Sequence, residues 1–72
     1  MTPVEFFEKG MRGSEIIVSN GRPMKIRIEY ISRLAECAVG KQVGTRRKIH
    51  LVLCRNLLKC GPCYFKSVEL LL

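Results

Sequence analysis

The sequence has no aspartate and no tryptophan, and His50 is its single histidine. The acid–base groups that most enzymes use are therefore reduced to six glutamates and one imidazole, and no nucleophile motif or phosphate-binding glycine loop accompanies them. No apolar run approaches the roughly 20 residues of a membrane-spanning helix. The N-terminal residues also lack the basic start and apolar core of a secretory signal. We expect a protein that is not an enzyme, that lies in the cytoplasm and that does not bind membranes.

The chain is short, and it contains neither an internal repeat nor a low-complexity segment. Its 72 residues predict a single domain over residues 1–72, with a small core, because a chain of this size buries only roughly 60% of its unfolded surface. A hydrophobic content of 47% is too high for a disordered tail. The apolar C-terminus, residues 70–72, exceeds what such a core is expected to cover, so we predict a homo-oligomer.

Positive charge is concentrated in the second half of the chain. Thirteen Lys and Arg face six Glu, which gives a formal net charge of +7. Residues 1–36 contain six basic and five acidic side chains, a net of +1, whereas residues 37–72 contain seven basic side chains and one acid, a net of +6. This asymmetry favours an anionic partner, and nucleic acid is the commonest one for a small basic protein. The alternative is a charged surface that only keeps the protein in solution.

Local signals predict a short helix followed by a β-hairpin. Thr2 and Glu5 have the spacing of a capping box, so we expect a helix over residues 3–11, which the following glycines end. Its expected apolar stripe consists of Val4, Phe6, Phe7 and Met11. Residues 15–30 hold two β-rich runs around Asn20-Gly21, a hairpin signal, and Pro23 predicts a turn longer than two residues.

The remaining segments predict further strands. Residues 31–39 fit a helix or a strand, and residue propensities slightly favour the helix. We expect a loop over residues 40–44, a strand over 49–54, a turn over 60–63 and a last strand over 64–72. The predicted fold class is β-rich α+β: a short N-terminal helix followed by a small, strongly curved antiparallel sheet.

Four cysteines allow three chemistries. Cys60-Gly61-Pro62-Cys63 is the tetrapeptide of the thioredoxin active site, but the nine residues after it cannot supply the rest of that fold, so we expect no catalytic thiol. A zinc site is the second possibility. Its ligands would be His50, Cys54, Cys60 and Cys63, with Cys37 as a substitute for His50. Because the spacing from Cys54 to Cys60 is uncommon, ordinary thiols without metal or cofactor are favoured.

Basic side chains provide the candidate nucleic-acid site. The consecutive Arg46, Arg47 and Lys48, together with Arg55, are predicted to contact phosphates, which attract such charges without sequence preference. Lys25 and Arg27 on the hairpin would extend this surface. An available aromatic ring, Tyr30, would add the base stacking that is typical of single-stranded RNA recognition.

The first part of the chain resembles the first motif of the Sm-like RNA-binding proteins. The resemblance rests on Pro3, Phe6-Phe7, Gly13, Ile16-Ile17-Val18, Asn20-Gly21-Arg22 and residues 24–30, and residues 52–56 fit the second motif. It implies an Sm/SH3-like bent five-stranded barrel, a ring oligomer and RNA binding. The sequence departs from the family at Ile26, Ser32, Glu36 and Asn56, so Arg55 alone remains of the positions that build the family's uridine pocket.

The leading functional prediction is non-catalytic binding of nucleic acid, with RNA favoured over DNA. A second hypothesis is a small protein-interaction module, as in viral or mobile-element proteins, that binds a host protein through its apolar C-terminus. A zinc-stabilised binding domain is a minor third. The sequence does not define the natural ligand or the number of subunits.

Overall fold

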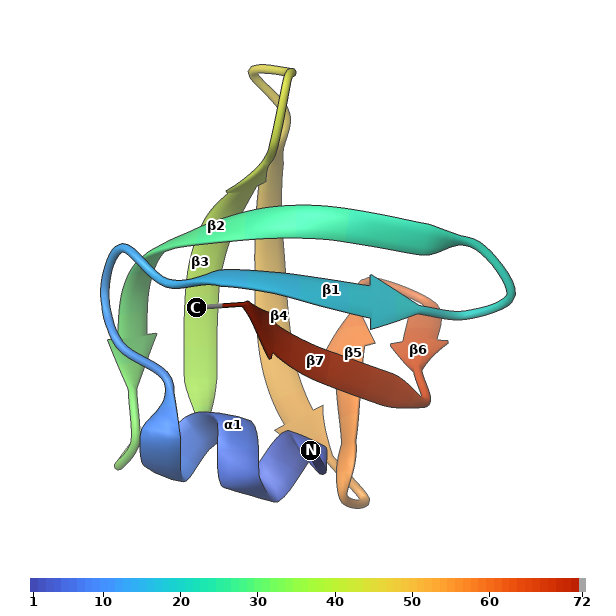
Figure 1. Cartoon of the computed structure of the whole chain (residues 1–72). Helices are drawn as coiled ribbons and strands as arrows, with labels where there is room; N and C mark the ends of the chain where they lie inside the picture. The colour runs from blue at the N-terminus through green and yellow to red at the C-terminus, as the bar shows by residue number, and fades with distance from the viewer. Residues whose placement is uncertain (72) are drawn as a thin grey trace.

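Seven antiparallel strands form one continuous sheet that bends around a single core (Figure 1). The computed structural model describes residues 1–71. The elements are α1 (Pro3–Lys9), β1 (Glu15–Ser19), β2 (Pro23–Ser32), β3 (Cys37–Gln42), β4 (Lys48–Cys54), β5 (Leu57–Cys60), β6 (Cys63–Phe65) and β7 (Ser67–Leu71). Their order in the sheet is β6-β5-β4-β3-β2-β1-β7. The predicted β-rich fold with one short helix and a curved antiparallel sheet is confirmed, and the sheet is nearly closed into a barrel.

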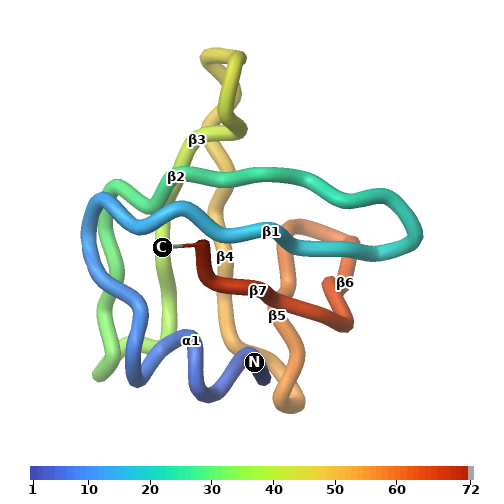
Figure 2. The backbone as a smooth tube through the Cα atoms, in the orientation of Figure 1, coloured from blue at the N-terminus to red at the C-terminus, as the bar shows by residue number. Residues whose placement is uncertain are grey.

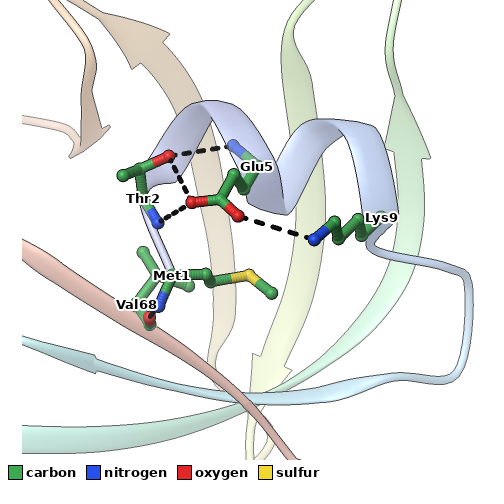
Figure 3. Close-up of polar contacts among 5 residues, drawn as sticks. All are labelled: Met1, Thr2, Glu5, Lys9 and Val68. Atoms are coloured by element: carbon green, nitrogen blue, oxygen red, sulfur yellow. Dashed lines mark hydrogen bonds and ion pairs between the residues drawn. The ribbon is translucent and has the colours of Figure 1, made fainter.

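The capping box predicted at the start of the chain begins α1 (Figure 3). The Glu5 backbone N–H donates to the Thr2 hydroxyl at 3.2 Å, and the Thr2 N–H donates to the Glu5 carboxylate at 3.2 Å. The helix ends two residues earlier than predicted because Gly10 turns into an extended conformation, which leaves Met11 exposed rather than in the apolar stripe. No helix within residues 1–71 is long and apolar enough to cross a membrane.

The β-hairpin around Asn20-Gly21 is present, and its turn is longer than two residues, as Pro23 predicted. Ser19 pairs with Pro23, so residues 20–22 form the connection. Gly21 has a φ of +97°, a backbone angle that residues with a Cβ rarely adopt. Along β2 the buried residues alternate with charged ones, with Ile26 and Ile28 in the core and Arg27 outside.

In the middle of the chain, the slightly favoured helix over residues 31–39 is wrong and the strand alternative holds, and the loop predicted over residues 40–44 begins only after Gln42. Residues 31–39 are not a helix: they complete β2, turn over residues 33–36 and begin β3, because strand pairing buries Ala38 in the core. Gly40 does not begin a loop but lies inside β3, where a Cβ would lie 2.5 Å from the Arg27 carbonyl oxygen. The sheet bulges here, between Ile28 and Tyr30 of β2, and a glycine lets the two strands approach.

The last third of the chain closes the barrel. Cys60 and Cys63 flank the predicted turn, but the single expected final strand is divided into β6 and β7 at Lys66. β7 then runs beside β1 (Figure 2), and the N-terminal ammonium of Met1 donates to the Val68 carbonyl at 3.1 Å. Leu70 packs against the core, so part of the apolar C-terminus is covered within one chain, and Leu72 lies outside the described residues.

Candidate nucleic-acid interface

A pocket of about 830 Å³ is lined by the β1–β2 turn, the β5–β6 turn and residues of the strands beside them. We call it the large pocket. It is lined by residues 20–22, Met24, Arg47, Ile49, residues 60–63 and Phe65. The volume lies within the usual range for small-molecule and cofactor sites. The side chains that line it include two arginines and no carboxylate, so an anionic group is favoured at its edge.

The apolar floor of the large pocket follows from strand alternation. Ile49 and Phe65 belong to the buried core, and Met24 packs against it half-buried. All three point inward because they alternate with outward residues along β2, β4 and β6. The two turns that wall the pocket, residues 20–22 and 61–62, each contain a glycine with positive φ.

The β3–β4 loop, residues 43–47, brings Arg47 to the lining of the large pocket, and Arg46 precedes it in the same loop. The loop is held by hydrogen bonds: the Thr45 hydroxyl donates to the Gln42 carbonyl at 2.9 Å, and the Arg47 N–H donates to the Thr45 hydroxyl at 3.1 Å. The Gln42 N–H donates to the Arg47 carbonyl at 3.1 Å. The backbone that carries the predicted phosphate contacts is therefore ordered, while both arginine side chains stay exposed.

Two predicted phosphate ligands, Arg27 and Lys48, lie on the outer face in a basic row with Lys41, which the sequence did not single out. The three residues are direct neighbours on β2, β3 and β4. Part of this charge is neutralised. Arg27 Nη2 lies 2.8 Å from the Glu15 carboxylate, and Lys25 Nζ lies 3.5 Å from it. The hydrogen bond from Arg27 is the main reason that the pKa of Glu15 is lowered. Lys25 and Arg27 thus contribute less free positive charge than the sequence suggested.

Two predicted site residues do not join the others. Arg55 lies in the β4–β5 turn, at the opposite end of β4 from Lys48, which separates their backbones by roughly 20 Å. Tyr30 is on the outer face, in register with Val39, and its side chain is 55% exposed. It does not line the large pocket. The structure therefore brings Arg46, Arg47 and Lys48 together and leaves Arg55 and Tyr30 apart.

The zinc ligand set is not assembled. His50 lies on the outward-facing row of β4, and the Cys54 thiol lies 4.0 Å from the Tyr64 hydroxyl. Cys60 packs against the core and Cys63 lines the large pocket, which is the inner side of the barrel. Among residues 1–71 no three His, Cys or Glu side chains are grouped as metal ligands. All four cysteines are free thiols.

A second, smaller hollow of about 450 Å³ adjoins the large pocket across the β1–β2 turn. We call it the small pocket. Asn20 and Gly21 line both, and the small pocket is completed by Ser19, Ser67, Tyr64 and Lys66. The Lys59 ammonium lies over the Tyr64 ring, 5.7 Å from the ring centroid, which is a cation–π arrangement. An aromatic ring and two lysines thus flank the continuation of the large pocket.

Several of these residues were missed by the sequence predictions. Met24, Ile49 and Phe65 belong to three separate strands, and only the curvature of the sheet brings them together. The Asn20-Gly21 and Cys60–Cys63 turns were recognised as turns, but nothing in their sequence says that they face each other. No family model, curated protein or solved structure matches this chain.

Proposed function

We propose that this protein binds single-stranded nucleic acid, with RNA favoured, and that the large pocket receives a base. The observation that carries the proposal is an apolar pocket with Arg22 and Arg47 at its edge. A nucleotide has the complementary chemistry, because its base offers a flat apolar face and its phosphate a negative charge. Binding needs no catalytic group, and the proposed role is non-enzymatic.

The arrangement of charge supports a path for the strand. Phosphates on either side of the inserted base meet Arg47 and Arg22, which line the large pocket, and Arg46 stands next to Arg47 in the β3–β4 loop. Across the β1–β2 turn, the small pocket offers the Tyr64 ring for a second base and Lys66 for its phosphate. Arginine suits phosphate because its planar guanidinium donates two parallel hydrogen bonds. The path fits a flexible single strand better than a duplex, whose bases are paired and stacked.

The direct test is to follow backbone amide resonances while a short single-stranded RNA is added to the assigned protein. The proposal predicts shifts at residues 20–22 and 46–47 and at Cys60, Gly61 and Cys63, with little change at Arg55 and Asn56 in the β4–β5 turn. A duplex of the same sequence and heparin, a polyanion without bases, are the controls. Equal shifts with heparin would mean that charge alone binds, and shifts confined to the outer face would refute insertion into the pocket.

The Sm-like resemblance adds a finer hypothesis to this proposal, namely RNA binding by a ring of subunits. A homo-oligomer stays a prediction. It is compatible with the two ends of the sheet, since within residues 1–71 β7 pairs with β1 alone and β6 with β5 alone. A protein partner at the C-terminus is the alternative function. The packing of Leu70 against the core removes part of its motivation, so nucleic-acid binding remains the preferred proposal.

A further inference from the structure

We infer that Cys60 and Cys63 form a reversible disulfide inside the wall of the large pocket. The two residues are direct partners in the β5–β6 register, and both thiols are free in this structure. Opposite residues in an antiparallel pair have Cα atoms about 4.5–5.5 Å apart. That spacing falls within the range of about 4.4–6.8 Å that a disulfide spans. The backbone therefore already has the separation that the bond requires.

The turn between the two cysteines holds this geometry. Gly61 has a φ of +59°, and Gly-Pro over two residues fits a type II′ turn, because glycine accepts the positive φ and proline fixes the negative one. Both side chains lie on the inner side of the barrel, since Cys60 packs against the core and Cys63 lines the large pocket. Cys37 and Cys54 have no cysteine opposite them, so the same reaction is not open to them.

Accessibility gives the reaction an order. Cys63 is exposed and Cys60 is half-buried, so a small disulfide such as oxidised glutathione reaches Cys63 first. The Cys63 thiolate attacks one glutathione sulfur, and one reduced glutathione leaves. The Cys60 thiolate then attacks the Cys63 sulfur and releases the second reduced glutathione. Two electrons pass from the protein to glutathione disulfide, the two thiol protons end on the two departing glutathione thiolates, and reduced glutathione in excess reverses both steps.

The Cys60–Cys63 disulfide and the proposed base share the large pocket, so binding of the base should affect formation of the disulfide. This second step rests on the proposed function. A base in the large pocket covers the thiols that line it, so a bound chain is protected from glutathione disulfide. If only empty pockets react, RNA at about nine times its dissociation constant leaves one chain in ten open and slows oxidation about tenfold. The rate of disulfide formation would then measure the fraction of protein with ligand bound, and ligand occupancy would predict that rate.

The experiment uses the whole protein in buffers with increasing ratios of oxidised to reduced glutathione. Remaining thiols are alkylated, and the digested protein is analysed by mass spectrometry. The inference predicts a Cys60–Cys63 disulfide, about 2 Da lighter than the reduced pair because two hydrogens leave. Added reduced glutathione should restore both thiols. The matched control is Cys60→Ser, in which Cys63 should keep a glutathione adduct because nothing displaces it.

The results can contradict the disulfide and the proposed function independently of each other. If the parent protein accumulates the same Cys63 adduct as Cys60→Ser and no internal bond, the disulfide inference is wrong whatever RNA does. If the bond forms but saturating RNA does not slow it, the disulfide stands and insertion of a base beside these thiols is contradicted. If RNA does not bind, the proposed function fails, while the mass measurement still decides the disulfide.

Discussion

At the scale of single residues, the site depends on three arginines, of which Arg22 and Arg47 line the pocket with the apolar floor. Arg47 and Arg46 come from a loop that hydrogen bonds hold in place, and Arg22 comes from the β1–β2 turn. The basic residues of the outer face differ, because Glu15 pairs with Lys25 and Arg27, and Glu29 lies 3.6 Å from Lys41. Arg22 and Arg47 at the large pocket are in none of these ion pairs, unlike Lys25, Arg27 and Lys41 of the outer face.

Replacement of Gly40 by even the small residue alanine should destabilise the fold strongly. An added Cβ would lie 2.5 Å from the Arg27 carbonyl oxygen and 2.6 Å from the Ile26 Cγ2 methyl. We expect Gly40→Ala to lower the free energy of unfolding by about 1–3 kcal/mol, as overpacked cores do. Urea denaturation measures this. The neighbouring Lys41→Ala is the control and should change stability by less than about 1 kcal/mol, because it removes one partly exposed ion pair. Equal effects of the two changes would show that the close approach of β2 and β3 is not rigid.

At the scale of elements, the helix and the first hairpin could be predicted because their signals are local. The capping box lies within residues 2–5, and the hairpin turn within residues 20–23. The strands after residue 30 were harder, because the good helix formers of residues 31–39 are overruled by pairing with β2 and β4. The short strand β5 was not predicted at all, and the division at Lys66 depends on a corner of the barrel.

Lowering the pH should weaken the capping box at the start of α1, because Glu5 becomes protonated. Its pKa is lowered, mainly by the hydrogen bond from the Thr2 backbone N–H, then by the Thr2 hydroxyl. A lowered carboxyl pKa stabilises the fold above its usual value of 4.5, and this contribution is lost as the pH falls through the folded value. Glu5→Gln keeps a side chain that completes a capping box but does not titrate. Between pH 5 and roughly pH 3 the parent should therefore lose more stability than Glu5→Gln in urea titrations. Parallel losses would contradict this role for Glu5.

At the scale of the whole molecule, the fold brings some of the predicted site residues together and keeps others apart, for a physical reason. Arg46, Arg47 and Lys48 are consecutive, so any fold keeps them together. Arg55 and Tyr30 were grouped with them by residue type, and the length of β4 and the outward face of β2 keep them apart. The pocket floor is contributed by β2, β4 and β6, which are not neighbours in the sheet and line one pocket only because the sheet curves.

The predicted oligomer can be tested at its apolar end. Leu71 is half-buried at the end of β7, in register with Glu15 of β1. Leu71→Lys removes an apolar contact while placing a lysine opposite Glu15, which keeps the fold itself well paired. Sedimentation at micromolar protein should show association that Leu71→Lys weakens more than Glu69→Lys, a matched change two residues away. A monomer at every concentration would contradict the oligomer without bearing on the pocket.

The central claim is that the β3–β4 loop and the large pocket form the nucleic-acid site. The most direct measurement is the salt dependence of single-stranded RNA affinity for the parent and for the triple change of Arg46, Arg47 and Lys48 to Ala. Each lost phosphate contact on a single strand reduces the slope of log affinity against log salt by about 0.7, so the triple variant should show a slope smaller by roughly 2. A charge-matched control changes Arg12 and Arg33 to Ala and Arg55 to Asn, a residue that tolerates the positive φ of that turn.

The control should keep the slope and most of the affinity of the parent, since none of its three residues lines either pocket. If the two triple variants lose affinity and slope equally, binding follows net charge alone and the proposed interface is wrong. If the parent binds no single strand even at low salt, nucleic-acid binding itself is contradicted.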